Sequence, residues 1–420
     1  MVLETEKIYQ GNCIEVLKDM PDESIDCVVT SPPYWGLRDY GTAEWEGGDE
    51  NCSHNPQKSD GGEREDRTLP LGRGGVYKSV CKCGAIRKDS QLGLEETPEE
   101  FVANLVKVFS EVKRLLKKEG SVWLNLGDSY AMSSMRGKNS EFKGAINQSK
   151  QGIVGIDKKI PIGLKPKDLV GIPWRVAFAL QADGWYLRQD IIWHKPNPMP
   201  ESVQDRCTKA HEYIFLLTKS PKYFYDAGAI KEKAVGGRWG GNKPMNINNS
   251  KDKKNIHNGL TRERDMEFEM RNKRSVWTIT TKPYKEAHFA TFPIELPTYC
   301  IKAGCPEKVC KKCKKPVIKE SYRENKLNVG YGNQHTPSGT HKKIGGKYQK
   351  FMEENPKKII EKPTCSCNVG FEGGIVLDPF FGSGTTGLAA QEHNRHWVGI
   401  ELNEEYIEIA HRRLAQKTLF

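Results

Sequence analysis

Apolar residues of this chain gather in short runs, each about as long as a buried strand. Such runs, bounded by glycine, proline and polar residues, are typical of strands in a sheet that is covered on both faces. The residues between them are more polar, and some recur at helical spacing. The runs lie at residues 24–30, 121–126, 186–194, 212–217, 375–378 and 396–400.

Amphipathic helices are predicted between these runs. The sequence Thr-Pro-Glu-Glu at 97–100 has the form of a capping box with proline at the first helical position. Apolar residues then recur at helical spacing, and the helix is expected to end at Gly120. Further helices are predicted at 173–182 and 383–391. This alternation favours an α/β fold, with a doubly wound, mostly parallel sheet and insertions between its elements.

Polar stretches separate parts of this core pattern. Of the 420 residues, 37% are hydrophobic and 28% are charged, and the net charge is +11. Residues 231–274 contain 12 Lys/Arg against 6 Asp/Glu, and residues 307–362 contain 15 against 6. A core with two basic inserts suits an enzyme that holds a polyanion. A solvated lysine-rich surface is the alternative interpretation.

The chain lacks the marks of a membrane or secreted protein. No apolar run approaches the roughly 20 residues of a membrane span. The first residues lack the basic and apolar regions of a signal peptide. We therefore expect a cytoplasmic protein, whose 12 cysteines are thiols or metal ligands rather than disulfides.

A polar-Pro-Pro-aromatic segment, Ser31-Pro32-Pro33-Tyr34, directly follows the first apolar run. Two consecutive prolines remove two N–H donors and fix φ, so the carbonyl groups of this loop are held rigidly. A rigid carbonyl beside the Ser31 hydroxyl can accept hydrogen bonds from an exocyclic amino group, and Tyr34 offers a face on which a flat base can stack. A plain Pro-Pro turn is the alternative.

A glycine-rich segment follows the run at 375–378. Gly382 and Gly384 allow the backbone to approach a ligand closely. The next predicted strand ends in Glu401, and an acidic residue there can hydrogen-bond ribose hydroxyls. Without a Gly-Lys-Ser/Thr sequence, the segment indicates a nucleoside cofactor rather than a phosphate loop, with an ordinary tight turn as the alternative. Together the two segments indicate methyl transfer from S-adenosylmethionine (SAM) to a base amino group.

In this order the segments resemble those of the β-group DNA amino-methyltransferases, in which the catalytic loop precedes the SAM loop. Residues 30–34 are similar to the catalytic motif, 378–386 to the SAM motif, and Glu401 to the ribose-binding acid. Asn12 lies where the family more often has an Asp that contacts the adenine moiety. The segment 288–293 resembles one that flanks the methionine end of the cofactor. The resemblance implies a cofactor site of Asn12, Thr30, His288, Phe292, Asp378, Pro379, Phe380, Phe381, Gly382, Ser383, Gly384, Thr385, Thr386 and Glu401.

The resemblance also implies a Rossmann-like SAM-dependent fold and direct attack by the amine of a flipped base in double-stranded DNA. Ser before Pro-Pro is usual for methylation of the 4-amino group of cytosine, and Asp for the 6-amino group of adenine. We therefore expect cytosine, with adenine as the alternative. Cys305-Pro306 reverses the Pro-Cys order used in carbon-5 methylation, which excludes that reaction. The implied catalytic residues are Ser31, Pro32, Pro33 and Tyr34.

Other functions fit these motifs less well. Methyltransferases of RNA or of protein glutamine amides also use an Xaa-Pro-Pro-Tyr loop, but they usually place the SAM loop first. A catalytically inactive DNA-binding protein of the same fold is a more distant alternative. We expect a restriction-modification enzyme that acts as a monomer or dimer, with a cognate restriction endonuclease as a candidate partner and no fused nuclease domain.

The architecture of the family places target recognition between the run at 212–217 and His288, where the chain is basic and rich in asparagine. Arginines there could read guanines or hold phosphates, and asparagines could read adenines. A disordered linker is the alternative. The candidate residues are Arg238, Arg262, Arg264, Arg271 and Arg274, with Asn246, Asn248 and Asn249.

Two groups of cysteines have spacings typical of zinc sites. Cys310-x-x-Cys313 and Cys365-x-Cys367 have the form of a four-cysteine knuckle. Because amine methylation needs no Lewis acid, such a site is expected to be structural. Reduced surface thiols are the alternative.

The second group would combine three cysteines with one histidine: Cys52, His54, Cys81 and Cys83. Other cysteines have no comparable spacing and are expected to be buried thiols. These are Cys13, Cys27, Cys207, Cys300 and Cys305.

The pattern thus divides the chain into a core and insertions. The core is expected to have a catalytic part, 1–39 and 96–228, and a SAM-binding part, 281–304 and 368–420. The insertions are expected at 40–95, with one cysteine group, at 229–280, the target-recognition region, and at 305–367, with the other cysteine group.

Overall fold

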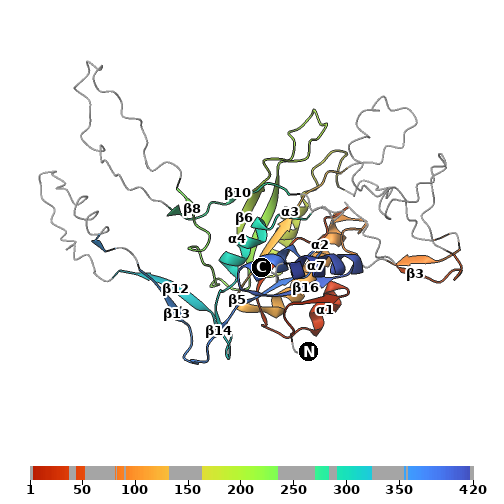
Figure 1. Cartoon of the computed structure of the whole chain (residues 1–420). Coiled ribbons are helices and arrows are strands. Elements are labelled where there is room, and N and C mark those ends of the chain that lie inside the picture. The colour runs from red at the N-terminus through yellow and green to blue at the C-terminus, as the bar shows by residue number, and fades with distance from the viewer. Residues whose placement is uncertain are drawn as a thin grey trace, which may run out of the picture.

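The computed structural model has an eight-stranded central sheet, in the order β1-β16-β15-β2-β5-β7-β6-β10 (Figure 1). Every neighbouring pair is parallel except β7 with β5 and with β6, which confirms the mostly parallel sheet. The residues described are 3–36, 44–52, 81, 83–88, 91–131, 163–234, 270–282, 291–323, 354–355 and 358–416. The strands are β1 (Lys7–Gln10), β2 (Ile25–Thr30), β5 (Leu116–Leu126), β6 (Tyr186–His194), β7 (His211–Thr218), β10 (Val276–Thr278), β15 (Ile375–Asp378) and β16 (His396–Glu401).

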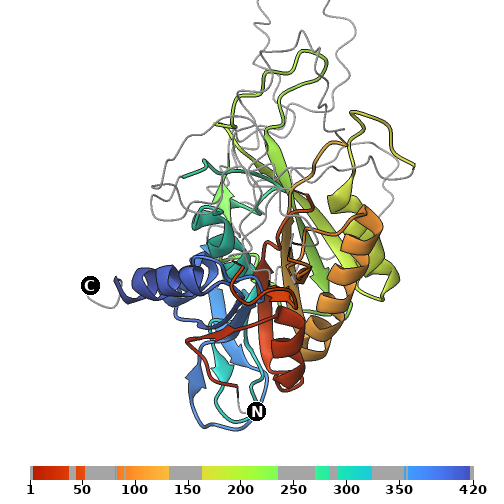
Figure 2. The same cartoon turned by 90° about the vertical axis from the view of Figure 1, so that its right-hand side faces the viewer.

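Helices cover both faces of this sheet (Figure 2). One face packs against α1 (Cys13–Asp19), α2 (Pro98–Leu115) and α3 (Ile172–Ala182). The other packs against α4 (Glu295–Gly304), α6 (Thr385–Glu392) and α7 (Glu404–Ala415). Burial on both faces explains why the central strands read as continuous apolar runs. Among the described residues, no helix combines the length and apolar character needed to cross a membrane.

The sequence misplaced the end of one helix and gave no clear sign of β1 and β10, the two edge strands of the central sheet. The capping box at Thr97 is present, but α2 ends at Leu115 rather than Gly120. Leu116 has extended φ and ψ and pairs with Ile25, because it is fully buried against the neighbouring strand. Strand β1, which was not predicted, adds an edge to the sheet by pairing with β16.

Among the described residues, four small two-stranded sheets lie in or beside the predicted insertions. They are β3 (Glu44–Glu46) with β4 (Ile86–Lys88), β8 (Glu232–Lys233) with β9 (Met270–Arg271), β11 (Val309–Cys310) with β14 (Phe371–Glu372), and β12 (Val317–Tyr322) with β13 (Lys358–Pro363). Most of their strand residues are exposed or partly buried, whereas both residues of β11 are buried, and one of these is Cys310.

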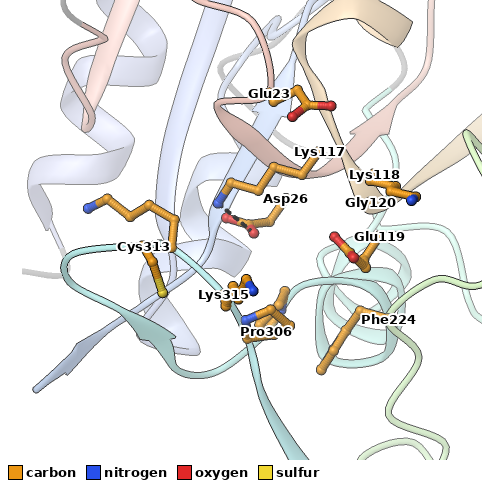
Figure 3. Close-up of a pocket in the computed structure, with 12 residues that line it drawn as sticks. Glu23, Asp26, Lys117, Lys118, Glu119, Gly120, Phe224, Pro306, Cys313 and Lys315 are labelled. Carbon is orange, nitrogen blue, oxygen red and sulfur yellow. Dashed lines mark hydrogen bonds and ion pairs between the residues drawn. The ribbon is translucent and has the colours of Figure 1, made fainter. Parts of the chain in front are cut away.

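A buried ion pair lies at the amino edge of the central sheet, beside a cavity (Figure 3). Asp26 Oδ1 is 2.8 Å from Lys117 Nζ, and Asp26 Oδ2 accepts the Ile375 amide at 2.9 Å. The Asp26 side chain is 5% exposed, and this burial raises its pKa while Lys117 opposes the shift. One carboxylate thus links β2, β5 and β15 at the edge opposite their carboxyl ends.

Replacing Lys117 should therefore destabilise the core. Lys117→Met leaves the Asp26 charge buried without its cation, which should lower the free energy of unfolding by about 3 kcal/mol at neutral pH. Because the variant raises the pKa of Asp26 further, the deficit should shrink as the pH is lowered and Asp26 takes up a proton. Urea denaturation at neutral and at acidic pH measures this. Lys118→Met, at an exposed position of the same strand, is the control, and equal losses in both variants would contradict the role of the ion pair.

Candidate functional site

Two loops from distant parts of the sequence leave adjacent strands at the carboxyl edge of the sheet. β2 ends at Thr30 and leads into the loop 31–34, and β15 ends at Asp378 and leads into the glycine-rich loop. From β2 the chain continues to β5, and from β15 it continues to β16, on the opposite side. The loops therefore flank the point where the winding of the sheet reverses, which is the usual ligand site of such folds.

The carboxylate of Asp378 joins the two loops. The Thr30 hydroxyl donates to its Oδ1 at 2.6 Å, and the Thr386 hydroxyl, from α6, donates to its Oδ2 at 2.7 Å. The Phe380 amide also donates to Oδ1, at 3.0 Å. Asp378 is 1% exposed, and its burial raises its pKa to about 7 although these three donors oppose the shift. These threonines, both predicted to bind cofactor, are buried and hold the loops together.

The glycine-rich loop turns sharply before α6. Gly382 and Gly384 have φ of +51° and +80°, which glycine adopts without strain. A Cβ at Gly384 would lie 3.1 Å from Ala410, so α7 packs closely against the loop at that point. A Cβ at Gly382 would meet no atom within 4 Å. The backbone at Gly382 therefore borders open space in which a ligand can lie.

Glu401 ends β16 beside this loop. Its Oε2 accepts the Gly382 amide at 2.8 Å, and its Oε1 accepts the amides of Leu402 and Asn403 at 3.0 and 2.9 Å. Burial raises the pKa of Glu401 above the ordinary carboxyl value, while the three amides oppose the shift. A carboxylate offers about four lone-pair positions, so these bonds leave capacity on Oε2 to accept a hydroxyl.

A chain of hydrogen bonds runs from Ser31 to a largely buried ion pair. Ser31 Oγ is 3.4 Å from the Tyr34 hydroxyl, which donates to Glu212 Oε2 at 2.8 Å. Lys195 pairs with Glu212 Oε1, and these two side chains are 19% and 16% exposed. The Ser31 hydroxyl therefore donates its hydrogen bond to the Tyr34 oxygen, so the lone pairs of Ser31 Oγ remain available to accept a hydrogen bond from a ligand. Glu212 and Lys195 were not predicted as site residues.

Close packing fixes the position of Tyr34. A Cβ at Gly127 would lie 2.4 Å from the Tyr34 ring, and a Cβ at Gly93 would lie 2.9 Å from the Tyr34 carbonyl oxygen. Asn125 Nδ2 donates to Glu212 Oε2 at 3.2 Å, which steadies the carboxylate that binds Tyr34. Gly93 lies in the predicted insertion 40–95, so the end of that segment packs on the catalytic loop.

The other predicted cofactor residues have varied surroundings. Asn12 is the N-cap of α1, with its Oδ1 accepting the Ile14 amide at 2.9 Å. Phe381 is 3% exposed and stacks on Trp397, so its ring lies in the core. Phe292 packs against the same core cluster. His288 lies outside the described residues.

Arg413 of α7 is a site residue that the sequence analysis missed. Its Nη1 donates to Ser383 Oγ at 3.0 Å and to Thr385 Oγ1 at 2.8 Å. Both hydroxyl side chains are buried. Arg413 therefore stabilises the end of the glycine-rich loop, and a surface-type residue in an amphipathic helix carries no sequence signal of such a contact.

Two of the predicted DNA-binding arginines are described. Arg271 and Arg274 both donate to Glu232 Oε1, at 2.8 and 2.6 Å, across the β8–β9 pair. Two guanidinium groups share one carboxylate, so this cluster keeps a net positive charge. Arg274 has a side-chain exposure of 65%. Arg238, Arg262 and Arg264, like the candidate asparagines, lie outside the described residues.

Both cysteine groups come together in space. The sulfur atoms of Cys310, Cys313, Cys365 and Cys367 all lie within 4.8 Å of one another, and so do those of Cys52, Cys81 and Cys83. His54 lies outside the described residues. Of the cysteines expected to be buried thiols, Cys13, Cys27, Cys300 and Cys305 are buried. The expectation was wrong for Cys207, which is exposed on a loop without regular structure.

Comparison with known proteins gives consistent matches. A family model described as DNA methylase matches residues 25–310 and 310–412. The type II methyltransferase M.XycI of Xanthomonas campestris pv. cyanopsidis is 35% identical over 99% of this chain and 89% of its own. M.Cfr9I of Citrobacter freundii is 35% identical over 97% of this chain and 87% of its own length. M.SmaI of Serratia marcescens is 34% identical over 98% of this chain and 91% of its own length. A solved structure of the PvuII DNA methyltransferase (cytosine-N4-specific) aligns with a TM-score of 0.47 at 15% identity, covering 98% of this chain and 87% of that one.

The hydrogen-bond chain predicts that Glu212 acts on turnover through Tyr34. Glu212→Gln weakens a charge-assisted bond and should lower kcat about tenfold while leaving the KM for cofactor nearly unchanged. Tyr34→Phe should lower kcat similarly, and the double variant should be little worse than either single one. Steady-state kinetics measure these values.

Glu119→Gln, at an exposed position on β5, is the matched control and should leave kcat unchanged. The positioning role would be contradicted if the losses of kcat in Glu212→Gln and Tyr34→Phe multiplied in the double variant. A rise in the KM for cofactor with no change in kcat would also contradict it.

Proposed function

Because the chain belongs to the DNA methylase family of amino-methyltransferases, we propose that it methylates the 4-amino group of cytosine at specific sites in double-stranded DNA. The family uses SAM and acts on DNA. The hydrogen-bond chain from Ser31 through Tyr34 to Glu212 carries this proposal, because it presents Ser31 as an acceptor for an amino group.

The residues at the carboxyl edge of the sheet fit the cofactor. When bound, SAM supplies an electrophilic methyl group on a sulfonium sulfur. Gly382 borders open space for it, Glu401 has acceptor capacity for its ribose hydroxyls, and Asp378 fixes the loop between them. Phe380 is partly exposed and offers an apolar surface to the cofactor.

The Ser-Pro-Pro-Tyr loop prepares the amine for attack. The target base leaves the DNA stack and lies against the Tyr34 ring, whose position is fixed by Gly127. Ser31 Oγ and the carbonyl groups of the loop accept hydrogen bonds from the two amino hydrogens. These bonds draw the nitrogen lone pair out of conjugation with the base and direct it at the methyl group. The amine nitrogen would take the methyl group as the bond to the sulfonium sulfur breaks, which leaves a neutral thioether, and the proton lost by the nitrogen would pass to solvent.

Adenine is the alternative substrate. Its 6-amino group offers the same two hydrogens to the loop, so the hydrogen-bond geometry suits both bases. The preference for cytosine rests on Ser31, since the adenine enzymes that the chain resembles usually have Asp at that position.

The relatives suggest a host-marking role. The named relatives are type II methyltransferases, which supports a restriction-modification function for this chain with a cognate endonuclease. We assign target recognition to the region 229–280, and its net positive cluster at Arg271 and Arg274 suits contact with phosphates.

The base assignment is tested by product analysis. The protein is incubated with SAM and unmethylated genomic DNA, which is digested to nucleosides and examined by mass spectrometry. We expect 4-methylcytosine, with turnover reduced about 100-fold by Ser31→Ala because an acceptor used in the transition state is lost. Ser110→Ala, on the exposed side of α2, should not change turnover. 6-Methyladenine would overturn the base assignment, and no methylated nucleoside would overturn the reaction.

A further inference from the structure

We propose that Cys310, Cys313, Cys365 and Cys367 bind one structural zinc ion. The inference concerns the folding of the segment before β15 and does not depend on the methyl-transfer reaction. It rests on the positions of the sulfur atoms, on the backbone around them and on the small core of the segment that they close.

The four sulfur atoms are placed for tetrahedral coordination. All lie within 4.8 Å of one another, and none forms a disulfide. A Zn–S distance of about 2.3 Å sets the sulfur–sulfur separation in a tetrahedral site at about 3.8 Å, so movements smaller than roughly 1 Å complete the site. Four thiolate ligands leave no open position, which is typical of a structural rather than a catalytic ion.

The backbone around the sulfurs supports metal binding. The backbone amides of Lys312 and Cys313 lie beside the Cys310 sulfur, and the amide of Cys367 lies beside the Cys365 sulfur. Amides so placed can orient thiolate ligands and offset their charge. Lys314, directly after Cys313, has φ of +56°, and its amide donates to the Cys310 carbonyl at 2.9 Å, so the chain reverses around the first cysteine pair.

The described residues between the two cysteine pairs have little hydrophobic core of their own. β12 and β13 form an isolated two-stranded ribbon, and every residue of β13 is exposed, including Ile359 at 68%. A two-stranded ribbon is at best marginally stable in water. A metal ion at its base can supply the folding free energy that apolar burial does not.

The zinc site would also hold in position the backbone that leads into β15. β11 pairs with β14, with Cys310 opposite Phe371. The next residues, Gly373 and Gly374, approach other backbone so closely that a Cβ at either would lie within 3 Å of a neighbouring atom. Cys313 lines the cavity beside Asp26 at the amino edge of the sheet (Figure 3). The tetrad therefore anchors the ribbon to the core at the edge opposite the SAM loop.

The second group of sulfurs has a similar arrangement, with Cys52 Sγ 3.7 Å from Cys81 Sγ. Its predicted fourth ligand, His54, lies outside the described residues, so the proposal is confined to the tetrad. All the variants compared keep Cys52, Cys81 and Cys83, so any metal bound by these three cysteines contributes equally to the zinc content of each.

Metal content of the purified full chain tests the proposal. Elemental analysis should show that Cys313→Ser and Cys367→Ser each contain one zinc fewer per chain than the unaltered protein. Cys207→Ser, an exposed cysteine outside both groups, should contain the same amount as the unaltered protein. Equal zinc in all four proteins would overturn the proposal, and iron in place of zinc would overturn the choice of metal.

Cobalt substitution provides a second readout, which reports the ligands of the bound metal in the unaltered protein. The unaltered protein, stripped of metal and titrated with Co²⁺, should show thiolate-to-cobalt charge transfer and the d–d bands of a tetrahedral site. Subtracting the spectrum of Cys313→Ser should leave the signal of one four-thiolate centre. A flat difference spectrum would overturn the proposal. SAM affinity should stay within about twofold in Cys313→Ser, because the cofactor loop lies at the other end of β15.

Discussion

The buried carboxylate of Asp378 is the contact on which the functional site depends. Its two oxygens accept hydrogen bonds from the hydroxyls of Thr30 and Thr386, so one residue connects the strand before the Ser-Pro-Pro-Tyr loop with the helix after the glycine-rich loop. Burial raises its pKa to about 7, so the ionised form is less favourable in the folded protein than in water. Three hydrogen bonds offset part of this cost, and losing one would leave buried acceptor capacity unsatisfied.

The sheet explains how residues almost 350 positions apart in sequence meet. β2 and β15 are neighbours, and helices cover the two faces around them. The carboxyl edge carries the glycine-rich loop and the Ser-Pro-Pro-Tyr loop, for which we propose cofactor binding and recognition of the amino group, while the amino edge carries the Asp26–Lys117 pair and the cysteine tetrad. The proposed functional loops and the stabilising contacts thus lie at opposite ends of the same strands.

Much of the core was predictable because its signals are local. Continuous apolar runs marked the buried strands, the capping box marked the start of α2, and the two loop motifs followed their strands directly. The order of the two loop motifs resembled that of the amino-methyltransferases, and the comparisons confirm the family.

What the sequence did not show depends on contacts between distant residues. Glu212 lies 178 positions from Tyr34, and nothing in its local pattern distinguishes it from other charged residues at the start of a strand. Arg413 reads as an ordinary surface residue of an amphipathic helix. Leu116 was assigned to a helix because its apolar character fits either element, and pairing with Ile25 decides in favour of a strand.

The central claim is that the two loops act as one site because Asp378 holds both. A double-mutant cycle of Thr30→Val and Asp378→Asn, with SAM affinity measured by calorimetry, tests it most directly. Thr30 belongs to the catalytic strand, yet its loss should weaken SAM binding, and the two substitutions should couple by about 1 kcal/mol or more. Additive effects within about 0.3 kcal/mol, or SAM affinity unchanged by Thr30→Val, would contradict the account.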